Sequence, residues 1–101
     1  MVRLTKAKRG KHRWVGILVN SKIKNRQELS SILSNLLEDS TWKLYDFVHM
    51  KKEDDILSII KVELKSHKKY VKIINSHDLL ETITSSGKII LVRQRLQITR
   101  S

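Results

Sequence analysis

The chain has 101 residues, of which 21 are Lys or Arg and 10 are Asp or Glu, and its formal net charge is +11. This length corresponds to one domain with a single core, and the absence of Cys excludes a disulfide framework and a thiolate metal site. No apolar run approaches the roughly 20 residues of a membrane span, so we expect a soluble, cytoplasmic protein with no membrane partner.

The positive charge lies at the two ends of the chain. Residues 1–26 hold nine Lys or Arg and residues 88–101 hold four, with no acid in either segment, so the ends sum to +13 and the middle to −2. Segregated charge of this kind indicates a polyanionic partner. Nucleic acid is favoured over a membrane, because the basic N-terminal arm (residues 1–12) has no amphipathic apolar face. A solvated tail without a partner is the alternative.

The first predicted strand, residues 13–20, follows the arm directly. Trp14, Gly16 and Leu18 would face one way and three β-branched residues the other, so both faces are apolar and the strand should be central. A helix should follow to about residue 38. Asn25 is its predicted N-cap, and Glu28 completes a capping box.

The second half of the chain predicts two strands, a helix and a last strand. Residues 41–50 and 56–65 alternate like strands around a polar turn, Ser66 can cap a helix that Gly87 ends, and residues 88–98 resemble a strand. The order βαββαβ predicts an α+β, ferredoxin-like sandwich: an antiparallel sheet in strand order 4-1-3-2 with both helices on one face. The domain would span residues 13–101, and its last strand would return beside the first, so the two basic ends would meet.

The residue pattern predicts no catalytic, metal or cofactor site. The four histidines (His12, His49, His67, His77) lack metal-ligand spacing, and no serine lies in a nucleophile elbow. The acids at 53–55 are explained by a hairpin turn. Small ferredoxin-like nucleases carry an acid at the end of the first strand, where this chain has Asn20, which cannot supply a carboxylate to a metal.

Binding should therefore be electrostatic. Base stacking in the manner of RNA-recognition modules is disfavoured, because residues 56–65 contain no aromatic residue and no glycine. The aromatic residues Trp14, Trp42, Tyr45 and Phe47 could stack on bases, but core or interface roles are commoner. The predicted RNA-binding residues are basic: Lys6, Lys8, Arg9, Lys11, Arg13, Arg93, Arg95 and Arg100.

Four stretches, KHRWVGILVN, KNRQELSSILSNLL, IIKVELKSHKKYVKIIN and GKIILVRQRLQITR, resemble in order the first strand, first helix, third strand with second helix, and closing strand of a known family. That family is the small Pop-five-type protein subunit of archaeal and eukaryotic ribonuclease P. The resemblance implies an accessory subunit without catalytic residues, which assists a catalytic RNA in removing the 5′ leader of precursor tRNA. It also implies partners: the ribonuclease P RNA, precursor tRNA indirectly, and a TIM-barrel protein subunit in a heterotetramer that contains a homodimer.

Two other functions are compatible with the pattern. One is a small dimerising interaction subunit, like that of the tRNA-modifying KEOPS complex, and the other is a ribosome-associated RNA-binding protein. The first would use an apolar sheet surface but would not need basic ends. Two same-side helices would leave one sheet face open. Apolar residues there predict a protein partner or a second copy over that face.

Overall fold

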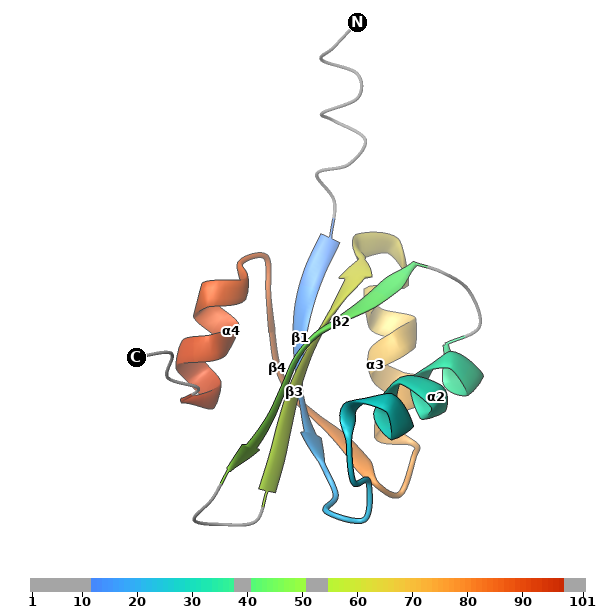
Figure 1. Ribbon diagram of the computed structural model, residues 1–101. Helices are drawn as coiled ribbons and strands as arrows, with labels where there is room; N and C mark the ends of the chain where they lie inside the picture. Colours follow the sequence, from blue (N-terminus) through green and yellow to red (C-terminus); the bar gives the residue numbers. More distant parts are fainter. Residues whose placement is uncertain (1–11, 38–40, 51–54, 98–101) are drawn as a thin grey trace, which may run out of the picture.

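The computed structural model describes residues 12–37, 41–50 and 55–97, which form a four-stranded sheet and three α-helices (Figure 1). The strands are β1 (His12–Val19), β2 (Trp42–Met50), β3 (Asp55–Glu63) and β4 (Leu80–Ser86). They lie in the order β2-β3-β1-β4, and every neighbouring pair is antiparallel. This α+β architecture is compatible with a ferredoxin-like fold.

Strand β1 lies in the interior of the sheet, as its two apolar faces predict. It pairs with β3 on one side and with β4 on the other. Val15, Ile17 and Val19 are buried in the larger core, whereas Trp14 and Leu18 pack against a smaller core on the opposite face. The sheet therefore has apolar layers on both sides.

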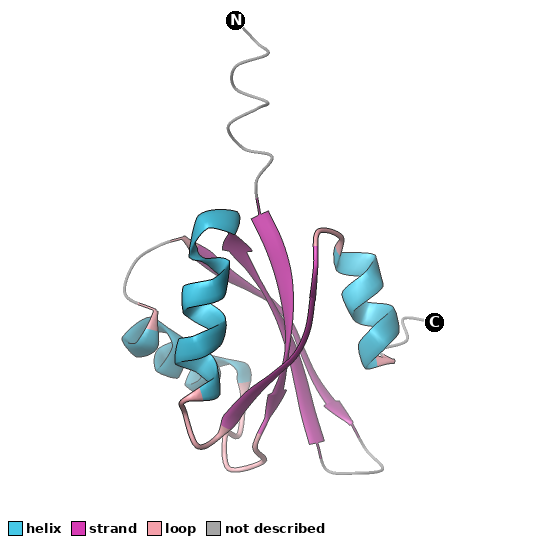
Figure 2. Ribbon diagram, turned by 180° about the vertical axis from the view of Figure 1, so that it is seen from behind, coloured by secondary structure: helices cyan, strands magenta, loops and turns pink. Residues whose placement is uncertain are grey.

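Helices α2 (Arg26–Leu36) and α3 (His67–Asn75) cover the face with the larger core (Figure 2). The predicted cap of α2 is confirmed: Asn25 Oδ1 accepts a hydrogen bond from the Glu28 backbone N–H at 2.9 Å. Glu28 in turn accepts from the backbone N–H of Lys24 at 2.7 Å. A short 3-10 helix, η1 (Leu64–Ser66), joins β3 to α3.

The predicted last strand is wrong, because its residues form helix α4 (Ile89–Leu96). This helix lies on the sheet face opposite α2 and α3 (Figure 1). The two predicted helices do share one face, and α4 is a third helix that the prediction lacks. Val92 and Leu96, four residues apart, are buried against Leu57 and Ile59 of β3. A run of apolar residues as short as 89–92 fits a strand or a buried helix equally well, and here the four-residue spacing onto the sheet decides.

The true fourth strand lies within the segment predicted as the end of the second helix. Helix α3 ends at Asn75, whose side chain accepts from the Thr82 backbone N–H at 2.8 Å and donates to the Thr82 hydroxyl at 2.9 Å. β4 contains the β-branched run Thr82 to Thr84, which favours a strand. Gly87 joins β4 to α4, and it does not cap a helix as predicted.

Helix α4 also covers part of the sheet face on which a protein partner or a second copy was expected. Trp14 and Leu18 pack against the smaller core, to which α4 contributes Val92 and Leu96. The expected open apolar face is therefore smaller than the sequence suggests. None of the helices in the described segments is long and apolar enough to cross a membrane.

Candidate nucleic-acid interface

The predicted RNA-binding residues divide into two groups. Lys6, Lys8, Arg9, Lys11 and Arg100 lie outside the described residues. Arg13 on β1 and Arg93 and Arg95 on α4 lie within them. Arg13 and Arg95 approach the same end of β4. The Arg13 guanidinium would be 3.5 Å from a Cβ atom at Gly87, and Arg95 Nη1 donates to the Ser85 carbonyl at 3.0 Å and to the Thr84 hydroxyl at 2.9 Å.

Arg93 forms an ion pair with Asp46 of β2. Its Nε donates to Asp46 Oδ2 at 2.8 Å and its Nη2 to Oδ1 at 3.0 Å. The side chain of Asp46 is 11% exposed and that of Arg93 is 26% exposed. These hydrogen bonds to the carboxylate raise the pKa of Arg93 above its ordinary value. In this structure Arg93 attaches α4 to the sheet, a role that the sequence does not indicate.

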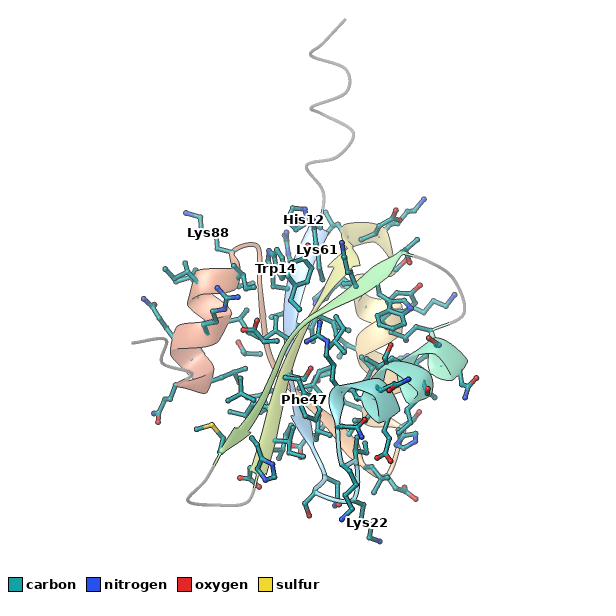
Figure 3. All side chains as sticks on the ribbon, viewed as in Figure 1. His12, Trp14, Lys22, Phe47, Lys61 and Lys88 are labelled. Carbon is teal, nitrogen blue, oxygen red and sulfur yellow. The ribbon has the colours of Figure 1, made fainter. Side chains whose placement is uncertain are left out.

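A cluster of aromatic rings and lysines lies at the end of the sheet where β1 begins. We call it the aromatic–lysine cluster, and its members come from three strands: His12, Trp14, Lys43, Tyr45 and Lys61. In the strand register Trp14 lies opposite Lys61, which in turn lies opposite Lys43. Figure 3 shows His12, Trp14 and Lys61 together at this end of the sheet, with Lys88 at the near end of α4.

The aromatic rings of the cluster pack edge to face. A lysine ammonium group lies over the Trp14 ring, and another lies over the Tyr45 ring. The centroids of Trp14 and Tyr45 are 4.6 Å apart with an interplanar angle of 79°, and those of His12 and Trp14 are 5.7 Å apart at 87°. Lys61 Nζ lies 5.5 Å from the Trp14 centroid, and Lys43 Nζ lies 5.9 Å from that of Tyr45. Both distances are within the range of a cation–π interaction.

A β-bulge gives Tyr45 its place in the cluster. Leu44 pairs with Ile60 and Asp46 pairs with Ile59, so Tyr45 is the extra residue on β2. Two side chains hold this irregular backbone. Arg26 donates to the carbonyls of Leu44 and Tyr45 at 2.8 and 3.1 Å, and the buried hydroxyl of Ser58 donates to the Asp46 carbonyl at 2.7 Å. Bulges commonly redirect a side chain at a strand edge, and this one brings Tyr45 to the Trp14 ring.

The other two candidate aromatic residues belong to the larger core. Trp42 and Phe47 both pack against it, and the Trp42 ring donates to the Leu37 carbonyl at 3.2 Å. The sequence treats all four aromatic residues alike. The sequence signal that distinguishes Trp14 from the core aromatic residues is the alternation along β1, which places Trp14 on the face away from α2 and α3. The register to Lys61 and the bulge at Tyr45 require the folded chain.

On the opposite sheet face, His67 lies near Arg13. His67 Nε2 and the Ser85 hydroxyl are 3.0 Å apart, within hydrogen-bond distance. Partial burial lowers the pKa of His67, and the charges of Arg13 and Lys68 lower it further. These surroundings therefore favour the neutral form of the imidazole.

The described residues contain no group of three or more His, Asp or Glu side chains that could hold a metal ion. Asp55 is the first residue of β3, while the neighbouring acids Glu53 and Asp54 lie outside the described residues. His77 Nδ1 accepts a hydrogen bond from the Leu79 backbone N–H at 3.1 Å. His49 is exposed on β2.

Comparison with known proteins finds no matching family model, no matching curated protein and no matching solved structure. The function is therefore inferred from the residues of this chain.

Proposed function

We propose that this protein binds RNA as a non-catalytic subunit of a ribonucleoprotein. The observation that carries the proposal is that the basic arm leads directly into the strand that holds part of the aromatic–lysine cluster. The aromatic–lysine cluster includes His12 and Trp14 of β1, and the arm that precedes His12 holds five Lys or Arg between residues 3 and 11 and no acid. Cations neutralise phosphates, and aromatic rings contact bases.

Positive side chains surround this end of the sheet in the described structure as well. Arg13 and Arg95 flank the end of β4 from the two faces of the sheet. Lys88 begins the segment that leads into α4 (Figure 3). Among the described residues, Glu63 is an acid at this end, where it lies opposite His12. The excess of positive charge favours a polyanion, and an electrostatic interface of this kind attracts nucleic acid through its phosphates.

We further propose that the ribonucleoprotein is ribonuclease P, and that the fold is the ferredoxin-like sandwich of its small subunit. Three of the four stretches that carry the resemblance support this: they form β1, α2, and β3 with α3. The fourth stretch forms α4 and not a closing strand, so it no longer supports the assignment. In such a particle this chain would neutralise charge and position the catalytic RNA beside a TIM-barrel protein subunit.

The alternative of a dimerising interaction subunit has less support. It requires a broad apolar sheet face, and α4 covers part of that face through Val92 and Leu96. It also leaves the charge segregation and the aromatic–lysine cluster without a role.

Crosslinking in cells tests the proposal. The full tagged chain is crosslinked, purified under denaturing conditions, and its bound RNA is sequenced. We expect one abundant structured RNA, enriched together with precursor tRNA, and a loss of most of this RNA in a variant with Lys6, Lys8, Arg9 and Lys11 changed to Gln. Recovery of no RNA above background, or equal recovery with that variant, would contradict RNA binding through the arm. Recovery of an unrelated RNA would contradict only the ribonuclease P assignment.

A further inference from the structure

The tyrosine of the aromatic–lysine cluster lies at the surface on a fixed stretch of backbone. Tyr45 is 38% exposed, although it stands on a bulge that Arg26 and Ser58 hold in place. Trp14 packs against the smaller core on one side and meets Tyr45 edge to face on the other. The result is a ring that is accessible to solvent and supported by a second ring that is fixed to the sheet.

The rings suit a ligand with a flat face, and the lysines around them suit negative charge on the same ligand. Lys43 is exposed and its ammonium lies over the Tyr45 ring. A planar base could replace this ammonium on the ring face, because stacking on an aromatic ring and a cation–π interaction use the same surface. The displaced Lys43 has a flexible stem and could then pair with a phosphate of the same nucleotide chain.

A cationic ligand, such as a methylated lysine of a peptide, fits this cluster less well. Aromatic cages for quaternary ammonium ions attract positive charge, but Lys43 and Lys61 already supply positive charge over both rings. Among the described residues, the acid Glu63 lies beside the cluster, opposite His12 and within 3.9 Å of Lys65. The net charge of the cluster therefore disfavours a cation and favours an anionic chain.

We infer that the aromatic–lysine cluster is a stacking site for one unpaired nucleobase, with Tyr45 as the platform, Trp14 as its support, and Lys43 and Lys61 contacting flanking phosphates. The inference rests on the proposed RNA binding and names the part of the RNA that is recognised. Unpaired bases are the usual targets of aromatic side chains in RNA recognition. The site differs from that of RNA-recognition modules, because its aromatic residues lie on β1 and β2 and β3 contributes only Lys61.

The test compares two ligands of equal charge. One is a short unstructured oligouridylate, and the other is an abasic oligomer with the same number of phosphates. The full chain should bind the oligouridylate roughly 5- to 150-fold more tightly, the range that corresponds to the stacking energy of one base as measured by alanine substitution of the aromatic residue. Tyr45→Leu should abolish this difference, whereas Tyr45→Phe, which keeps the ring, should retain it.

A pair of lysine variants serves as the matched control for charge. Lys43→Gln should weaken binding of the oligouridylate and reduce its dependence on salt. Lys72→Gln, which removes the same charge from α3 on the opposite face of the sheet, should leave binding within about twofold of the wild type.

Photocrosslinking of the wild-type chain tests the same point without any substitution, so a variant that fails to fold does not remove the test. With a thiouridine-substituted oligomer, mass spectrometry should find the adduct on Tyr45 or Trp14. Equal binding of the two oligomers, or adducts found only elsewhere, would overturn the stacking site and leave RNA binding intact. Failure to bind either oligomer would overturn the proposed function as well.

Discussion

Substitution of Gly16 by alanine should loosen the contact between α4 and the sheet. A Cβ atom at this position would lie 3.0 Å from Leu96 Cδ1 and 3.1 Å from Val92 Cγ1. Both distances are shorter than the optimal separation of carbon atoms, which is about 3.5–4.0 Å. Val92 is 0% exposed and Leu96 is 6% exposed, so neither side chain can move aside into solvent.

Two opposing contributions set the size of the effect. Overpacking a buried site typically costs about 1–3 kcal/mol. Replacing glycine by alanine also restricts the unfolded chain, which stabilises the folded state by about 0.4–1 kcal/mol where the backbone allows it. The backbone at Gly16 has no positive φ, so alanine adds no backbone strain. We expect a net loss of about 1–2 kcal/mol, and each kcal/mol should lower Tm by about 4–8 °C.

Urea denaturation measures the loss, and amide hydrogen exchange locates it in residues 89–96. The matched control is Gly87→Ala, whose Cβ would meet only the Arg13 guanidinium at 3.5 Å, an ordinary contact. This control should be neutral or slightly stabilising. If Gly16→Ala were as stable as the wild type, with unchanged protection of the α4 amides, the packing of α4 on β1 described above would be wrong.

Three further changes test other parts of the structure. Arg93→Ala should destabilise the fold by about 2 kcal/mol, since it leaves a mostly buried Asp46 carboxylate without its charged donor. In a double-mutant cycle with Asp46→Ala, the two losses of stability should not add. Simple additivity would contradict the ion pair. The pKa of His67 lies below its ordinary value of 6.5, so the unfolded chain takes up this proton first as the pH falls. The contribution of His67 to stability should therefore be full above pH 6.5, decline as the pH falls below it, and level off below the folded-state pKa. Urea midpoints across this range should decline less steeply for His67→Gln than for the wild type. An equal decline in both would refute the lowered pKa of His67. Asn25→Ala should cost about 1 kcal/mol through loss of the α2 cap, measured by thermal denaturation, whereas no loss of Tm would contradict that cap.

The first half of the fold could be predicted because its local signals agree with one another. The apolar alternation of β1 on both faces identifies an interior strand, and Asn25 with Glu28 marks the start of α2. β3 and the start of α3 also lie where the sequence predicts them. The chain after α3 could not be predicted, because the local signals there conflict. Residues 89–92 are continuously apolar, which suits a strand or a buried helix, and Gly87 suits either a helix end or the turn before α4.

The candidate site was only partly predictable for a related reason. Charge segregation can be read from the sequence, and it points to the arm and to Arg13. The ion pair between Arg93 and Asp46 joins residues that are 47 positions apart, and no local pattern reports it. The same holds for Tyr45, which reaches Trp14 only through a bulge and the register of three strands.

The salt dependence of RNA affinity tests the central claim, that this chain binds RNA through its positive charge, most directly. If the arm together with Arg13 and the lysines of the cluster neutralises about six phosphates of a single strand, the logarithm of the binding constant should fall with the logarithm of the salt concentration at a slope of about −4. The measurement is a fluorescence anisotropy titration of the full chain with a labelled single-stranded RNA over a series of salt concentrations. A slope near zero would contradict the account.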